Sequence, residues 1–164
     1  MLQQLSPRMV FIGLALLGVS AYLIARLYME AYLQLDPCPL CMTQRVPVVV
    51  WSVIAIIAAA HNPGRLGRSV YAGLCGLCAY LGGLVSARHI WLQNLPEDLV
   101  PACGPSLDYM LSNLPFMDTV RLTLAGDGNC AETMWTFLGL SIPEQCLLLF
   151  ALVMAVSLWQ GVRR

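Results

Sequence analysis

Seven cysteines give this chain its most specific chemistry, because several of them stand where disulfide exchange is possible. Cys38 and Cys41 form a C-x-x-C pair directly before an apolar run. A disulfide across so short a loop constrains the unfolded chain very little, so the pair suits reaction better than structural cross-linking. Cys103 and Cys130 form a second, widely spaced pair in a polar, proline-rich segment. The two pairs predict a relay of dithiols and disulfides.

The position of Cys41 favours its thiolate, which is the reactive form of a thiol. The apolar run 46–60 is too short to cross a bilayer, so its helix is expected to begin near Cys41. Free N–H groups and the helix dipole favour negative charge in that first turn. Arg45 follows one turn later on the same face, where its cation would stabilise the thiolate further. Pro47 either bends this helix or marks its true start, and in the second case the argument from a shared face weakens.

The composition indicates a membrane protein. Hydrophobic residues make up 59% of the 164 residues and charged residues 11%, whereas soluble domains carry about 25% charged residues. A bilayer core about 30 Å thick requires roughly 20 apolar residues in a helix. Four spans are expected, at residues 9–29, 41–60, 69–87 and 144–161. The chain is therefore predicted to form one all-α domain over residues 1–164, a four-transmembrane-helix bundle.

The charges orient these spans. Five arginines and no acids lie on the side of the termini and the linker between the second and third spans, namely Arg8, Arg65, Arg68, Arg163 and Arg164. The positive-inside rule places that side in the cytoplasm and the loops 30–40 and 88–143 outside. Arg26 and Glu30, four residues apart near the outer end of the first span, are expected to pair. A formal net charge of +0 offers no basic surface for nucleic acid.

Other segments have simpler interpretations. The stretch 9–25 is longer than the apolar core of a cleaved signal peptide, so a membrane span is favoured. The long outer loop is expected to hold short helical pieces rather than a packed domain. Its run 111–124 is apolar enough to form an interfacial helix on the membrane surface, although Pro115 interrupts it.

The remaining cysteines are expected to be structural. Cys75 and Cys78 also have the C-x-x-C spacing, but they lie in mid-span, without the water or the charge that a thiolate requires. Cys75 begins a stripe of small residues of the kind that helix contacts in lipid prefer. Cys146 is expected to be a small apolar packing residue. The outer cysteines could instead form only structural disulfides, or ligate zinc, but compact zinc knuckles have closer spacing, and no metal site is predicted.

The whole pattern resembles the DsbB family, the bacterial inner-membrane thiol:quinone oxidoreductases. The resemblance rests on Cys38-Pro-Leu-Cys41 with Arg45, and on Gly128-Asn-Cys-Ala-Glu132 followed by Trp135-x-Phe-Leu-Gly-Leu140. It covers nearly the whole chain. It implies a multi-pass protein of the inner membrane, with cytoplasmic termini and periplasmic cysteine loops.

The resemblance also implies a direction for electron transfer. Cys103 and Cys130 would form the disulfide that meets a soluble periplasmic DsbA-like thiol oxidase, with Cys103 forming the mixed disulfide. Cys130 would pass electrons to Cys38 through a transient link between the two loops. Cys41 would then reduce ubiquinone or menaquinone, and relays of this kind keep the bacterial periplasm oxidising.

Two further residues receive quinone-binding roles from the resemblance. Arg45 would hold the quinone, since a permanent cation suits the negative charge that develops on the ring oxygens. His89, at the outer end of the third span, matches the second quinone contact of the family, although a solvated position is an alternative. Three other hypotheses remain open: a paralogue serving a dedicated partner, a tetraspan scaffold stapled by disulfides, and a membrane metal-binding protein.

Overall fold

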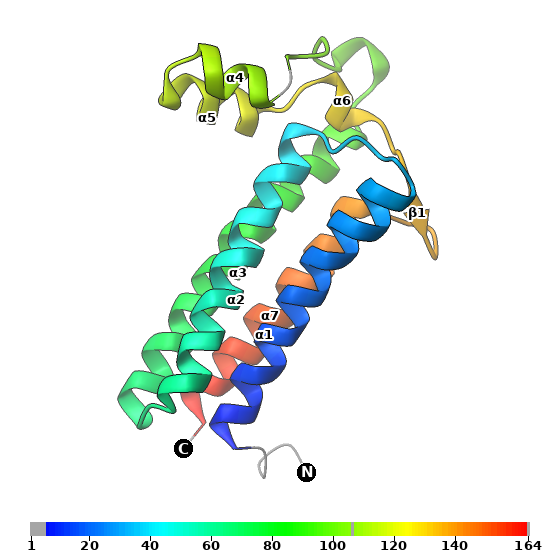
Figure 1. The fold of residues 1–164 in the computed structure, drawn as a ribbon. Helices are drawn as coiled ribbons and strands as arrows, with labels where there is room; N and C mark the ends of the chain where they lie inside the picture. Colours follow the sequence, from blue (N-terminus) through cyan, green and yellow to red (C-terminus); the bar gives the residue numbers. More distant parts are fainter. Residues whose placement is uncertain (1–5, 106, 164) are drawn as a thin grey trace.

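The computed structural model describes residues 6–105 and 107–163 and is built mainly of helices (Figure 1). Its long segments are α1 (Pro7–Leu23) continued by the π-helix η2 (Ile24–Tyr32), α2 (Pro39–His61), α3 (Arg65–Gln93) and α7 (Ile142–Val162). All four are long and apolar enough to cross a membrane. They run side by side as a bundle, which confirms the predicted all-α architecture.

The helices are longer than the apolar runs from which they were predicted. The third helix covers Arg65–Gln93 rather than 69–87, and the second begins at Pro39 rather than at residue 41. Hydropathy marks only the part of a helix that suits lipid, whereas backbone hydrogen bonding continues into the polar interface. As a result His89 lies on a helix and is not in the loop 88–143. Pro47 lies inside α2, so it does not mark the start of that helix.

Both termini lie at one end of the bundle, with the linker between α2 and α3 (Figure 1). The Gln160 side chain donates to the Pro7 carbonyl at 3.1 Å, and the Ser69 hydroxyl donates to the Gly161 carbonyl at 2.9 Å. These hydrogen bonds hold the arginine-rich ends of the chain together. Both ends lie at the same end of the bundle, as an even number of spans requires. Arg164 lies outside the described residues.

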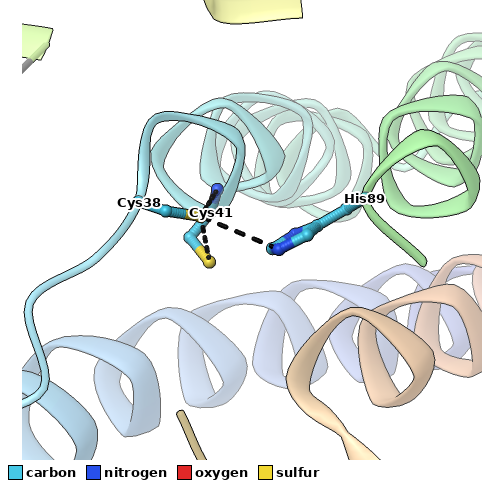
Figure 2. Close-up of side chains that lie close together, drawn as sticks. All are labelled: Cys38, Cys41 and His89. Carbon is cyan, nitrogen blue, oxygen red and sulfur yellow. Dashed lines mark hydrogen bonds between the residues drawn. The ribbon is translucent and has the colours of Figure 1, made fainter. Parts of the chain in front are cut away.

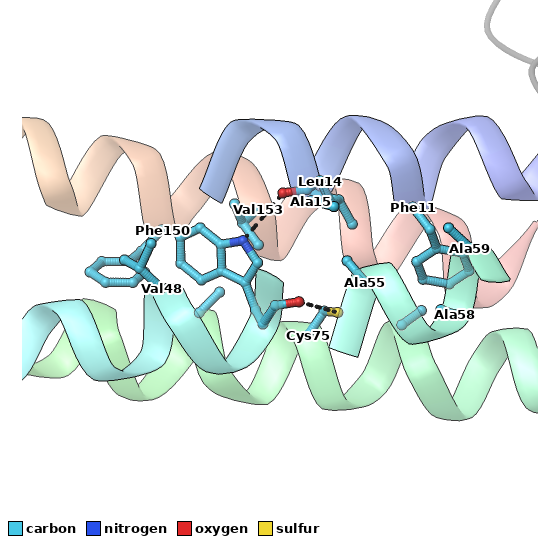
Figure 3. Close-up of a cluster of buried hydrophobic side chains, with 13 residues drawn as sticks. Phe11, Leu14, Ala15, Val48, Ala55, Ala58, Ala59, Cys75, Phe150 and Val153 are labelled. Carbon is cyan, nitrogen blue, oxygen red and sulfur yellow. Dashed lines mark hydrogen bonds between the residues drawn. The ribbon is translucent and has the colours of Figure 1, made fainter. Parts of the chain in front are cut away.

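The bundle packs around a core of aromatic and small side chains (Figure 3). Trp51 of α2 and Phe150 of α7 meet edge to face, with ring centroids 5.5 Å apart. Cys75 is fully buried, and its thiol donates to the Trp51 carbonyl at 3.8 Å. Cys78 and Cys146 pack partly buried against the same core. The structure thus agrees with a packing role for these three cysteines.

Large apolar side chains also cover the outer faces of the helices. They include Leu16, Leu23, Val53, Ile56, Leu77, Leu81, Leu152 and Leu158. In water, so much exposed apolar surface would lead to aggregation. In a bilayer it is the natural contact surface for lipid.

Between α3 and α7, the residues that the structure describes form only short elements. These are η3 (Glu97–Leu99), α4 (Leu107–Asn113), α5 (Phe116–Ala125), α6 (Gly128–Ala131), β1 (Thr136–Phe137) and β2 (Leu140–Ser141), the strands pairing as an antiparallel hairpin. Pro115 separates α4 from α5, so the apolar run 111–124 does not form one continuous helix. Both helices project sideways from the end of the bundle opposite the termini, whereas α6 lies over that end (Figure 1).

Candidate active site

The first thiol pair lies at the N-terminus of α2. Cys38 is the N-cap residue, and its sulfur accepts a hydrogen bond from the Cys41 backbone N–H at 3.3 Å. Pro39 occupies the first helical position, where its fixed φ angle favours the helix and its missing N–H is not needed. The two sulfurs are 3.0 Å apart. Cys41 therefore lies in the first turn as predicted, while the sulfur that caps the helix belongs to Cys38.

Cys130 brings the second loop to the first pair. It lies on α6, is fully buried, and packs with Cys38, Leu40 and Leu92. Its thiol is hydrogen-bonded to the Cys38 sulfur. That hydrogen bond, followed by burial, raises the pKa of the Cys130 thiol. Two cysteines from different outer loops thus lie together in one buried cluster.

Cys103 is the exposed member of the group. Its segment is attached to α6 by two hydrogen bonds: Gly104 N–H donates to the Asp127 carboxylate at 3.2 Å, and Gly128 N–H donates to the Ala102 carbonyl at 3.4 Å. A Cβ atom on Gly128 would lie 3.1 Å from the Cys103 sulfur and 2.8 Å from a backbone carbonyl. Glycine is therefore required for this close approach.

The four sulfurs form a path from the surface to the bundle. Cys103 is exposed, Cys130 and Cys38 are buried, and Cys41 is partly buried. All seven cysteines are free thiols in this structure. The arrangement can pass a disulfide between the two loops, because exchange requires one sulfur to reach another directly.

The raised pKa of Cys130 predicts slow alkylation. In the fully reduced protein, Cys130 should react with iodoacetamide at least about tenfold more slowly than Cys103 at about pH 8, since the thiolate is the nucleophile. Its rate should keep rising with pH after ordinary thiols have levelled off. Site-resolved mass spectrometry measures both rates. Cys38→Ser removes the largest cause of the shift and should speed the reaction of Cys130, and an unchanged rate in that variant would contradict this explanation.

Arg45 and Cys41 line a common cavity of about 240 Å³. The cavity lies between η2, the outer part of α2 and the start of α7, and its walls are mainly apolar, with Ala21, Ile24, Val48, Ile142 and Leu149 among them. Cys146 also lines it. Glu30 reaches the cavity from η2 and forms ion pairs with both Arg26 and Arg45. The expected Arg26–Glu30 pair is confirmed, and the second partner of Glu30 is a contact that sequence reasoning missed.

His89 faces the first cysteine pair instead of this cavity (Figure 2). Its Nε2 lies 3.8 Å from the Cys38 sulfur, and its Nδ1 lies 3.2 Å from the Gln44 side-chain nitrogen. Both His89 and Gln44 are almost completely buried. Gln44 was not singled out from the sequence, although a polar residue one turn after Cys41 was a signal that could have identified it.

Three side chains at this point could also hold a metal ion. The ligand atoms of Cys38, Cys41 and His89 all lie within 4.8 Å of one another. Thiolate and imidazole are the ligands that zinc prefers, and zinc usually takes four. The sequence predicts no metal site. The positions of these three side chains offer an alternative, namely a metal ion held by Cys38, Cys41 and His89.

The four apolar helices define a multi-pass membrane protein. The cysteines of its two outer loops lie at one end of the bundle, so the class of chemistry that this site can carry out is that of cysteine thiols. Comparison with known proteins makes the assignment narrower. Residues 7–160 match the family model described as disulfide bond formation protein DsbB. The chain therefore belongs to the DsbB family of disulfide bond formation proteins.

Individual relatives agree over nearly their full lengths. Disulfide bond formation protein B of Saccharophagus degradans is 52% identical over 147 residues, which cover 90% of this chain and 89% of the relative. The protein of the same name from Stutzerimonas stutzeri is 45% identical over 159 residues, 97% of each chain. Disulfide bond formation protein B 1 of Pseudomonas aeruginosa is 43% identical over the same coverage. No solved structure matches the chain.

Proposed function

We propose that this protein is a thiol:quinone oxidoreductase that reoxidises a soluble periplasmic dithiol oxidase of the DsbA type. Its electrons would pass through two cysteine pairs to ubiquinone or menaquinone in the bacterial inner membrane. One observation carries the proposal: contacting sulfurs lead from the α6 loop to Cys41, which lines an apolar cavity together with Arg45. A water-borne protein and a lipid-dissolved ring could meet this path at its two ends.

The exchange steps follow from the order of the sulfurs. A thiolate of the partner attacks Cys103 in a Cys103–Cys130 disulfide and releases Cys130, and the second thiol of the partner then displaces Cys103. Cys130 attacks Cys38 in a Cys38–Cys41 disulfide, which breaks that bond and releases Cys41 as a thiolate. Cys103 finally attacks Cys130 and frees Cys38. Both electrons then reside on the pair at the membrane.

The cavity beside Cys41 fits a quinone ring. Its walls are mainly apolar, as a lipid-soluble ligand requires, and Arg45, Gln44 and Gln145 are among the few polar residues that line it. A bound quinone would accept two electrons and two protons. Arg45 would orient the ring and face the oxygen on which negative charge develops. The second contact that the family resemblance assigns to His89 would require the ring to reach past Cys41 toward Cys38.

A turnover assay tests the proposal. Purified protein is supplied with a reduced periplasmic dithiol oxidase and ubiquinone-1 or a short-chain menaquinone, and quinone loss is followed by absorbance. We expect catalytic turnover, with formation of one disulfide in the partner for each quinone consumed. If neither quinone is reduced while the partner is present, the proposal is wrong.

Replacing Arg45 with alanine should weaken quinone binding. The apparent KM for quinone is expected to rise about tenfold or more, because an interaction with the ring has been removed while the cysteines remain. The fold should be retained, as judged by circular dichroism. Arg121→Ala, which alters a charge on the projecting α5, is the matched control. Quinone kinetics equal to those of the unaltered protein would contradict this role for Arg45.

The proposed orientation has its own test. The arginine-rich end is placed in the cytoplasm, and the cysteine loops in the periplasm. A membrane-impermeant maleimide added to intact cells should therefore label reduced Cys103. Labelling only after the cells are opened would place this end of the bundle in the cytosol and exclude a periplasmic partner.

The metal alternative is favoured by the cluster of Cys38, Cys41 and His89. It requires stoichiometric zinc or copper in the purified protein, and loss of that metal when Cys38 is replaced. A relay requires neither. A scaffold with structural disulfides differs from both, since it would lack turnover with quinone and would hold no metal.

A further inference from the structure

The Glu30 carboxylate lies between two guanidinium groups at the outer end of the bundle. It forms ion pairs with Arg26, on its own helix, and with Arg45, on α2. The side chain of Arg26 is 61% exposed, whereas those of Glu30 and Arg45 are only 11% and 17% exposed. The Glu30–Arg45 pair is therefore the shielded part of the cluster, and the pair that joins two helices.

Arg45 borders two different spaces. One is the apolar cavity that also contains Cys41 and Glu30 in its walls. The other is a groove along α1 and α2, lined by Tyr22, Arg26, Met42, Arg45, Val46, Val49 and Val50. Glu30 lines the cavity and is not part of the groove lining. The carboxylate thus attracts the Arg45 guanidinium from the cavity side.

Without that carboxylate, Arg45 would have little reason to stay at the cavity. A long arginine side chain at the membrane interface extends its charge toward water when it has no partner. The groove beside Arg26 offers the guanidinium a second position away from the cavity, although another cation already lies there. The guanidinium is also planar with five N–H donors, so Glu30 can hold one edge while the other donors remain available.

We propose that Glu30 is a positioning residue for quinone reduction, which holds the Arg45 guanidinium on the cavity side, next to Cys41. This proposal rests on the proposed function of the chain and adds a residue to its quinone site. Glu30 acts through Arg45 and transfers no electron or proton itself. Arg26 pairs with Glu30 from the exposed side, where an ion pair contributes little stability.

The experiment compares quinone kinetics in four forms of the full-length protein: unaltered, Glu30→Gln, Arg45→Ala and the double variant. Ubiquinone-1 is the probe, and a reduced DsbA-type oxidase is the electron donor. Glu30→Gln preserves the size of the side chain and removes its charge. We expect the KM for ubiquinone-1 to rise roughly fivefold to tenfold, with kcat changed by less than about twofold. In the Arg45→Ala background, Glu30→Gln should cause no further rise, because the group that it positions is gone.

Two further variants serve as controls. Glu30→Asp keeps the charge on a shorter side chain and should give a KM between those of the unaltered protein and Glu30→Gln; it also replaces Glu30→Gln if that variant does not fold. Asp118→Asn makes the same change from acid to amide on the exposed surface of α5, and should leave both constants unchanged.

Three results would overturn the proposal. The first is a Glu30→Gln variant in which both KM and kcat are unchanged, and the second is a further rise of KM when Glu30→Gln is added to Arg45→Ala. The third is a lower kcat with an unchanged KM, which would indicate that Glu30 transfers a proton instead. Failure of the unaltered protein to reduce quinone would refute the proposed function itself, and is therefore distinguishable from all three.

Discussion

Replacing Cys41 with serine is expected to lower quinone turnover by about a thousandfold or more, because a serine hydroxyl can neither form a disulfide nor act as a comparable nucleophile at neutral pH. Cys41 is the cysteine of the first pair whose side chain lines the apolar cavity next to Arg45. The turnover assay with reduced partner and ubiquinone-1 measures the loss.

The same variant should retain the first half of the reaction. Reduced partner should still reduce a Cys103–Cys130 disulfide once per protein molecule, without turnover, which quenched-flow and thiol labelling can detect. Cys78→Ser, in mid-span, should keep its turnover within about twofold of the unaltered protein. Turnover by Cys41→Ser within tenfold of that rate would show that electrons reach the quinone by another route.

The second large effect concerns packing of the bundle. Gly82 of α3 lies against the Phe150 ring, and a Cβ atom there would come within 2.2 Å of a ring carbon. Gly82→Ala should therefore destabilise the bundle by about 1–3 kcal/mol, as overpacking of a well-filled core does. The α3–α7 pair is the most extensive helix contact of the fold, so the cost cannot be avoided by a small local shift.

Unfolding in mixed detergent micelles measures this free energy. Gly73→Ala on the same helix is the matched control, because no atom lies within 4 Å of its added Cβ, and alanine favours a helix over glycine by roughly 1 kcal/mol. It should be neutral or stabilising. Phe150→Leu should partly rescue Gly82→Ala by removing ring atoms. Equal stabilities of the Gly82→Ala and Gly73→Ala variants would refute the close contact.

The four spans could be predicted because each contains a long apolar run, although the run 46–60 had to be extended toward Cys41 to reach membrane length. Their ends could not, since hydropathy stops where charged residues begin while the helix continues. The helix α3 continues past the predicted end of its span at residue 87 and includes His89. This residue is therefore a buried helical residue beside Cys38. The π-helix η2 left no signal in the apolar pattern, because a local change of hydrogen-bond register does not alter composition.

The spacing of residues along the chain was sufficient to predict one half of the site, the half that contains Cys41 and Arg45. The interval from Cys41 to Arg45 predicted that both would face one space, and they line one cavity. Contacts between segments distant in the sequence could not be found in this way. The approach of Cys130 to Cys38 depends on how α6 sits over Leu40 and Leu92. The Glu30–Arg45 pair likewise depends on how η2 packs beside α2.

Under the proposed function, the burial of Cys130 has a consequence for the fidelity of oxidation. It has no exposed surface, and Cys38 has only 5% of its surface exposed. Small soluble thiols such as glutathione would therefore reach the exposed Cys103 and the partly buried Cys41 more readily than the two buried sulfurs. The exchange step between Cys130 and Cys38 would then take place inside the protein, where low-molecular-weight reductants have little access to the reacting sulfurs.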